Sequence, residues 1–150
     1  MIIKKVPLTS RNKAKLIAEL AYDKKAEDII ILDMRRVVNF CDYFVVISAS
    51  SERHAQAIAS GIEEGLLECG LKVRYKEGLK SSKWILVDLG DVVTHIFETE
   101  VREFYGLEHL WQDAPRVNWQ KKSTLRLRSG LTLSEIEESK PKSSKTSNRT

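Results

Sequence analysis

A single-domain α/β fold is predicted by three features of this 150-residue sequence. Two segments, residues 11–25 and 50–70, repeat apolar side chains at helical spacing. Segment 43–49 is a nearly continuous apolar run, which is typical of a strand that is buried on both faces. Segment 84–97 is divided by a Gly-Asp pair into two short runs, as in a β-hairpin. Together these patterns predict a mixed sheet of about five strands with helices on both faces.

The first half of the chain is predicted to form one helix and two strands. Thr9 or Ser10 can cap the helix at 11–25, because a hydroxyl oxygen accepts from the free N–H groups of the first turn. The strands are expected at 28–34, with the sequence DIIILDM, and at 43–49, with the sequence YFVVISA. The apolar stripe of the helix consists of Leu16, Ile17, Leu20 and Ala21.

The next segments alternate between helix and strand. The helix at 50–70 begins with serines and ends at a glycine, and a strand is expected at 71–75. A strand, a helix and a strand in this order favour a parallel crossover. After the hairpin, Thr99 can cap a short helix that ends at Gly106. Its inward side chains are expected to be Val101, Phe104 and Tyr105.

The hairpin turn determines which side chains share a face. Gly90 suits the positive φ of a type II′ turn, so that Leu89 pairs with Val92 and the register of both strands follows. One face then carries Ile85, Val87, Leu89, Val92, Thr94 and Ile96, and the other carries Trp84, Leu86, Asp88, Val93, His95 and Phe97. The first set is an ordinary core face. The second mixes aromatic and ionisable groups, and either another helix of this chain or a partner surface can cover it.

Charge divides the chain into a nearly neutral domain and a basic end. Residues 1–120 hold 17 basic and 18 acidic side chains, whereas residues 121–150 hold eight basic and three acidic ones. The Ser- and Lys-rich end cannot build a core. We therefore predict an α/β domain at 1–118 and a basic, disordered tail at 119–150, for which loose RNA contact is an alternative to a solvated terminus.

Cysteine usage and apolar runs predict a reduced, cytoplasmic protein. Cys41 and Cys69 lie far apart, without the spacing of a disulfide framework or a zinc site. No segment approaches the ~20 apolar residues of a membrane span, and the N-terminus lacks the features of a signal peptide.

Candidate sites for chemistry are few. The stretch ISASSERH leads from a strand into a helix N-terminus, where anions can bind, but it lacks the glycines and the lysine of known phosphate loops. Asp88 and Asp91 do not share one strand face, so they do not form the carboxylate pair that holds two metal ions. The three histidines fall on different elements. We therefore expect no catalytic residue, metal ligand or cofactor.

Four blocks of sequence carry a resemblance to a known family. They are CDYFVVISASS at 41–51, KEG at 76–78, WILVDLGDVVTHIF at 84–97 and REFYGLEHLWQDA at 102–114. In this order and spacing they resemble the ribosomal silencing factor family, also called Iojap-like proteins, over roughly residues 11–115. The sequence departs from the family at Ala49, where members usually have glycine, and in its polar extension beyond about residue 118.

The resemblance implies a binding function on a reduced nucleotidyltransferase-like fold. Members of the family bind the large ribosomal subunit through a ribosomal protein on its subunit-joining face, obstruct association with the small subunit and so repress translation. On this basis the partner-binding residues are expected to be Glu77, Gly78, Trp84, Leu86, Asp88 and His95. A homodimer of the free protein is left open. The rival function is a phosphoryl-transfer enzyme that uses the serine loop.

Overall fold

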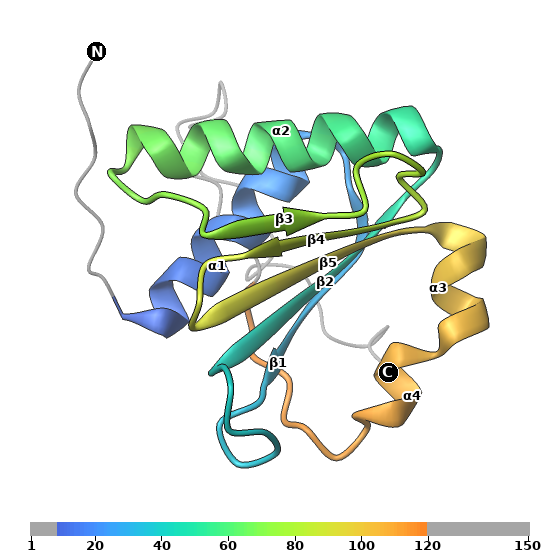
Figure 1. Ribbon diagram of the computed structural model, residues 1–150. Coiled ribbons are helices and arrows are strands. Elements are labelled where there is room, and N and C mark those ends of the chain that lie inside the picture. Colours follow the sequence, from blue (N-terminus) through green and yellow to red (C-terminus); the bar gives the residue numbers. More distant parts are fainter. Residues whose placement is uncertain (1–8, 120–150) are drawn as a thin grey trace, which may run out of the picture. The chain divides into compact units, whose positions relative to one another are not determined.

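The computed structural model describes residues 9–119, which form a five-stranded mixed sheet with helices on both faces (Figure 1). The predicted fold class is confirmed. The predicted tail lies almost entirely outside the described residues. The elements are α1 (Ser10–Asp23), β1 (Glu27–Asp33), β2 (Tyr43–Ala49), α2 (Glu52–Glu68), β3 (Tyr75–Glu77), β4 (Trp84–Asp88), β5 (Val92–Glu98), α3 (Thr99–Tyr105) and α4 (Leu107–Leu110).

The strand order is β1-β2-β5-β4-β3, with β2 and β5 parallel at the centre and the other neighbours antiparallel. All seven residues of β2 are buried, as its unbroken apolar run predicts. The hairpin of β4 and β5 has the predicted register, with Trp84 opposite Phe97 and Leu86 opposite His95. Gly90 at its turn has a φ of 101°, which a residue without a Cβ adopts easily.

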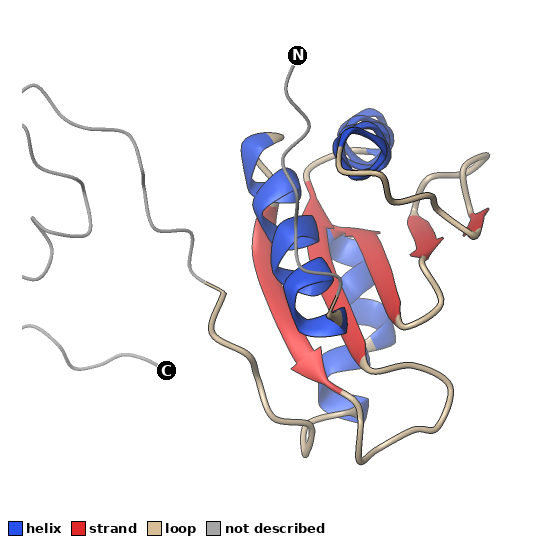
Figure 2. Cartoon of the chain, turned by 90° about the vertical axis from the view of Figure 1, so that its left-hand side faces the viewer, coloured by secondary structure: helices blue, strands red, loops and turns tan. Residues whose placement is uncertain are grey.

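Helices α1 and α2 cover the first face of the sheet, and Figure 2 shows α1 in front of the strands and further helical turns behind them. Thr9 caps α1 by accepting from the backbone N–H of Asn12, and Ser51 caps α2 by accepting from that of His54. The core on this face joins apolar side chains of both helices to those of four strands. Its largest members are Ile17, Ile31, Tyr43, Ile47, Ile58, Ile62, Leu66, Ile85 and Ile96.

The second face carries a smaller core beneath the segment that contains α3 and α4. Leu32, Phe44 and Phe97 belong to its buried part, and Trp84 and Trp111 pack against it while remaining partly exposed. The segment after α4 returns to the outer edge of β1, where the N–H of Val117 donates to the carbonyl of Ile31 at 2.9 Å. The far edge of β1 is thereby covered.

Three local predictions were wrong. The strand after α2 is Tyr75–Glu77 rather than 71–75, and two strands separate it from β2, although the ladder makes the two run in the same direction. Glu98 occupies the N-cap of α3. Phe104 is 82% exposed and Tyr105 53% exposed. The buried side chain of α3 is instead that of Arg102, which donates hydrogen bonds to Ser48 and to the carbonyl of Asp28.

Trp119, the first residue of the predicted tail, contacts the domain. Its indole N–H donates to the carbonyl of Ile29 at 3.0 Å, and its ring lies edge-on to that of Tyr22 at 6.2 Å. Within the described part of the chain, no helix has the length and the apolar character to cross a membrane.

Candidate functional site

Aromatic side chains gather on the second face where β4 begins and α3 ends. The ring centroid of Trp84 lies 4.8 Å from that of Phe97 on the neighbouring strand and 4.8 Å from that of Tyr105 on α3. Phe104 continues this cluster, with its ring 5.2 Å from that of Tyr105. Trp84 is half-buried, whereas the two rings of α3 are largely in solvent. The cluster thus extends from the core to the surface.

His95 supports this cluster from inside. Its side chain is only 6% exposed, and its Nδ1 accepts a hydrogen bond from the indole N–H of Trp84 at 3.1 Å. Burial lowers the pKa of His95 to about 4, so the ring is neutral at neutral pH. Because Nδ1 accepts, the single ring proton lies on Nε2, an atom that is buried without a hydrogen-bond partner among the described residues.

A hollow of about 360 Å³ opens beside Trp84. It is lined by Ser81, Lys83, Trp84, Glu100, Val101, Phe104 and Tyr105. Its wall is mainly apolar, and Glu100 and Lys83 contribute one acidic and one basic residue to it. A depression of this kind accepts an apolar side chain of a partner, while charged groups around it select the partner's orientation.

Leu86 and Asp88 share the face of Trp84, as the register predicts, and both are half-buried. Leu86 lies opposite His95 and packs against the second core. Asp88 stands at the other end of β4, where its carboxylate accepts from the backbone N–H of Gly90 at 2.6 Å. Its observed contact therefore stabilises the hairpin turn. Glu100, which sequence reasoning missed, lines the hollow together with Trp84, Phe104 and Tyr105.

Glu77 and Gly78 lie at the edge of the sheet. Glu77 is exposed in β3, where it pairs with Leu86. Gly78 has a φ of +87°, and a Cβ on this residue would lie 2.0 Å from the carbonyl oxygen of Trp84. Only glycine permits this approach of two backbone segments. Gly78 thus determines the conformation of the loop that leads into β4.

The six predicted site residues form one continuous region, but they differ in accessibility. Trp84, Leu86 and Asp88 are half-buried, Glu77 is exposed, and His95 is inside. Tyr105 and Phe104 are the exposed members of the aromatic cluster, and the sequence prediction missed them because it directed both rings inward. Their position in REFYG, directly before a helix-ending glycine, was the only available signal.

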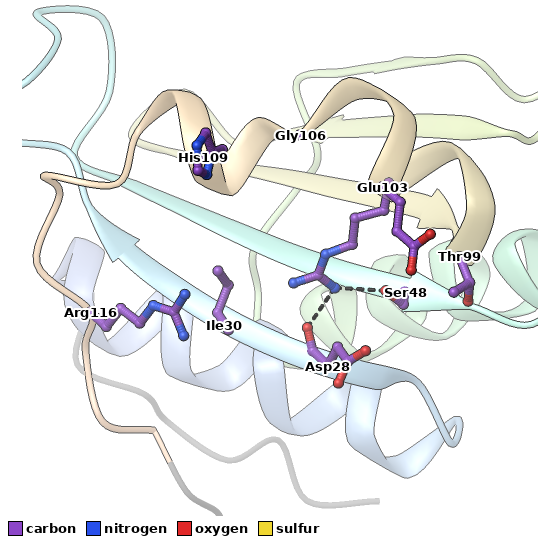
Figure 3. A pocket seen from close by; sticks show the side chains of 9 residues that line it. Asp28, Ile30, Ser48, Thr99, Glu103, Gly106, His109 and Arg116 are labelled. Atoms are coloured by element: carbon purple, nitrogen blue, oxygen red, sulfur yellow. Dashed lines mark hydrogen bonds between the residues drawn. The ribbon is translucent and has the colours of Figure 1, made fainter. Parts of the chain in front are cut away.

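The serine loop, on which the rival enzymatic function depends, has its hydroxyl groups engaged within the domain. Ser51 caps α2, and the Ser50 hydroxyl lies 3.1 Å from Nδ1 of His54. Ser48 accepts from the guanidinium of Arg102 at 2.7 Å. That guanidinium also donates to the carbonyl of Asp28, as the dashed lines in Figure 3 mark. These contacts favour a structural role for the loop.

The loop borders a hollow of about 470 Å³. Side chains of both charges line it, as Figure 3 shows for Asp28, Glu103 and Arg116. The described residues contain no group of three or more His, Cys, Asp or Glu side chains placed to hold a metal ion. Burial raises the pKa of Cys41 to about 11, so this thiol is protonated and a weak nucleophile at neutral pH.

Comparison with known proteins shows which family the chain resembles. The family model described as "Ribosomal silencing factor during starvation" matches residues 7–150. The chain is 42% identical over 108 residues to the ribosomal silencing factor RsfS of Bacillus subtilis, an overlap that covers 72% of this chain and 92% of the relative. It is also 32% identical over 99 residues to the mouse protein named "Mitochondrial assembly of ribosomal large subunit protein 1", covering 64% of this chain and 43% of that one.

A solved structure shares both the fold and the sequence pattern. The crystal structure of a protein from Chromobacterium violaceum superimposes with a TM-score of 0.68 and 31% sequence identity, and the match covers 78% of this chain and 97% of that one. The residues that the family model matches, 7–150, include all four sequence blocks. The chain belongs to the ribosomal silencing factor family.

Proposed function

We propose that this protein binds the large ribosomal subunit through a ribosomal protein on its subunit-joining face and blocks association with the small subunit. The single observation that carries the proposal is the aromatic cluster of Trp84, Phe104 and Tyr105, which opens to solvent beside a hollow. Partly exposed Trp and Tyr side chains over a pocket are typical of the residues that supply most of the binding energy in an interface.

Family membership supports this use of the surface. The relatives are named as ribosomal silencing factors, and the mouse relative is named for assembly of the large ribosomal subunit. Glu100 lines the hollow beside the cluster, and Glu77 is exposed on β3, the strand next to β4. Ribosomal proteins are generally basic, so these groups would steer and orient such a partner more than they would raise its affinity.

The mechanism is steric. A protein bound at the subunit-joining face occupies volume that the small subunit needs, so the two compete for one surface of the large subunit. Such repression of translation requires no cofactor and no chemical turnover. The engaged hydroxyl groups of Ser48, Ser50 and Ser51 support binding rather than phosphoryl transfer as the function of this fold.

Co-sedimentation with purified ribosomal particles tests the proposal. The protein should sediment with isolated large subunits and not with isolated small subunits, and it should lower the yield of joined ribosomes when added before the small subunit. Sedimentation of the free protein also determines whether it is a homodimer. Equal binding to both subunits, or unchanged joining in the presence of bound protein, would contradict the steric mechanism.

The Trp84→Ala variant tests the surface. Affinity for the large subunit should fall by about 2 kcal/mol or more, because an anchoring ring is lost from the interface. Its cost in stability should stay below the ~3–5 kcal/mol of a fully buried tryptophan, because the ring is half-buried.

Trp119→Ala is the matched control for this change. Trp119 is also half-buried, but it packs against Tyr22 and Ile29, away from the aromatic cluster. This variant should lower the melting temperature while its folded fraction binds large subunits normally. The assignment of the surface is wrong if Trp84→Ala destabilises the fold strongly and its folded fraction still binds like the wild type.

A further inference from the structure

His95 is a buried polar side chain in an aromatic environment, and packing alone does not explain why a histidine stands there. Its ring lies among aromatic side chains, with centroids 4.6 Å from Phe44, 6.0 Å from Trp84 and 6.2 Å from Phe97. A neutral imidazole has one nitrogen that donates a hydrogen bond and one that accepts a hydrogen bond, and each needs a partner when the ring is buried. Nδ1 has one in Trp84, whereas Nε2 has none among the described residues. An apolar ring would fill the same space without this penalty.

We propose that His95 is a positioning residue, which fixes the indole of Trp84 in the orientation that docks to the partner. This inference rests on the proposed function and deepens it. His95 itself, being buried, does not touch the partner. It acts through the hydrogen bond of 3.1 Å between the indole Nε1–H and Nδ1.

The geometry explains how one bond can orient a large ring. Trp84 is the first residue of β4, and its indole lies between Phe97 of β5 and Tyr105 of α3. Contacts between aromatic rings do not satisfy the indole N–H, which usually finds a hydrogen-bond partner when it is buried. Since Nε1 is on one edge only, a buried acceptor selects the rotamer in which that edge faces the sheet. Trp84 also lines the hollow, together with Glu100 and Phe104.

Two further features make the bond well suited to this task. The acceptor is buried, so water does not compete with it. The low pKa keeps His95 neutral, so Nδ1 accepts throughout the neutral range. Preorganising an anchor in its bound orientation raises affinity because less conformational freedom is lost on binding.

The His95→Phe variant separates positioning from stability. Phenylalanine keeps an aromatic ring of similar size and removes both ring nitrogens. The melting temperature should be unchanged or higher, and affinity for large subunits should fall roughly three- to tenfold, the range expected for one lost hydrogen bond. In nitrogen-proton correlation spectra of the free protein, the indole resonance of Trp84, assigned by its absence in Trp84→Phe, should move upfield.

Thr94→Val is the matched control. Thr94 is the neighbour of His95 in β5, it is fully buried, and its hydroxyl also lacks a partner among the described residues, but its side chain faces the first core. This variant should likewise keep or raise the melting temperature. It should leave both the Trp84 indole resonance and the affinity for large subunits unchanged.

A double-mutant cycle completes the test. Trp84→Phe removes the donor, so adding His95→Phe in that background should change affinity no further. An additive loss would mean that His95 acts independently of Trp84 and would overturn the proposal. A strong fall in the melting temperature of His95→Phe would make His95 a structural residue and overturn it as well.

Failure of this inference is distinguishable from failure of the proposed function. If the wild type does not bind large subunits, the proposed function is wrong and the docking role of His95 falls with it. If the wild type binds and His95→Phe binds equally well, only the positioning role is wrong. An unmoved Trp84 indole resonance in His95→Phe would lead to the same conclusion without any ribosome in the sample.

Discussion

The two faces of the sheet differ in what their side chains do, although both are covered by helices. On the first face, apolar side chains of α1 and α2 meet those of the strands in a continuous core. On the second face, the core is smaller and includes a buried histidine, a buried arginine and half-buried tryptophans. This contrast supports the proposal that the first face maintains the fold and that the second face presents the docking surface.

Strand β5 shows this contrast at single-residue resolution. Thr94 and Ile96 point to the first face, and His95 and Phe97 point to the second, yet all four are buried. Burial therefore does not distinguish a stabilising residue from one that supports a docking surface. Contacts do: Ile96 belongs to the first core, whereas His95 is bonded to a side chain that reaches the surface.

The largest effect is expected on the first face. Ile96→Ala should lower the free energy of unfolding by about 2 to 5 kcal/mol, because it removes a fully buried side chain from the main core and leaves a cavity. Chemical denaturation measures this loss. At a temperature where the variant is folded, its affinity for large subunits should equal that of the wild type. Weaker binding of large subunits by a folded Ile96→Ala protein would contradict the proposal that only the second face takes part in docking.

A smaller effect should appear when pH is lowered, and it belongs to the second face. The pKa of His95 is about 4 in the folded protein and near the ordinary 6.5 when the chain is unfolded. Between these two pH values the imidazole binds a proton in the unfolded state but not in the folded state. The contribution of neutral His95 to stability is therefore complete above pH 6.5 and is lost as pH falls toward 4, by roughly 3 kcal/mol in total.

Unfolding measured at several pH values tests this sign. Wild type minus His95→Phe should give a stability difference that becomes steadily less favourable to the wild type between pH 6.5 and 4. Burial of the imidazole is the cause of this shift. A difference that stays constant with pH would show that the imidazole is not held neutral inside the folded domain.

Much of the first face and of the hairpin could be predicted from the sequence, because local signals there agree with the tertiary structure. The Gly90-Asp91 turn set the register, and with it the side on which Trp84 and His95 lie. The unbroken apolar run of β2 predicted a strand that is buried on both faces. In each case the local sequence pattern of one segment was sufficient to predict its structure, because that structure does not depend on residues far away in the sequence.

The details of the second face depend on contacts between different elements, and sequence reasoning did not predict these contacts. Apolar spacing in α3 favoured Phe104 inside, but Arg102 reaches Ser48 and the carbonyl of Asp28 and takes that place. The role of Gly78 follows from its approach to Trp84, which only the fold reveals. The same is true of His95, whose bond to Trp84 spans the two strands of the hairpin.

The smallest effect on stability is expected from Phe104→Ala, a variant that should separate docking from stability. Phe104 is 82% exposed, so removing its ring should change the free energy of unfolding by no more than about 0.5 kcal/mol. An aromatic ring left so exposed adds nothing to the core, and its contact with Tyr105 places it in the proposed docking surface. Affinity for large subunits should therefore fall by more than 1 kcal/mol, about fivefold or more.

Leu67→Ala provides the comparison for that ring. Leu67 is also a large exposed apolar side chain, but it lies on α2, which covers the first face. Its loss should leave both unfolding and large-subunit binding unchanged. If Phe104→Ala binds as tightly as Leu67→Ala, the docking surface ends at Trp84 and Tyr105, and the exposure of Phe104 has no part in it.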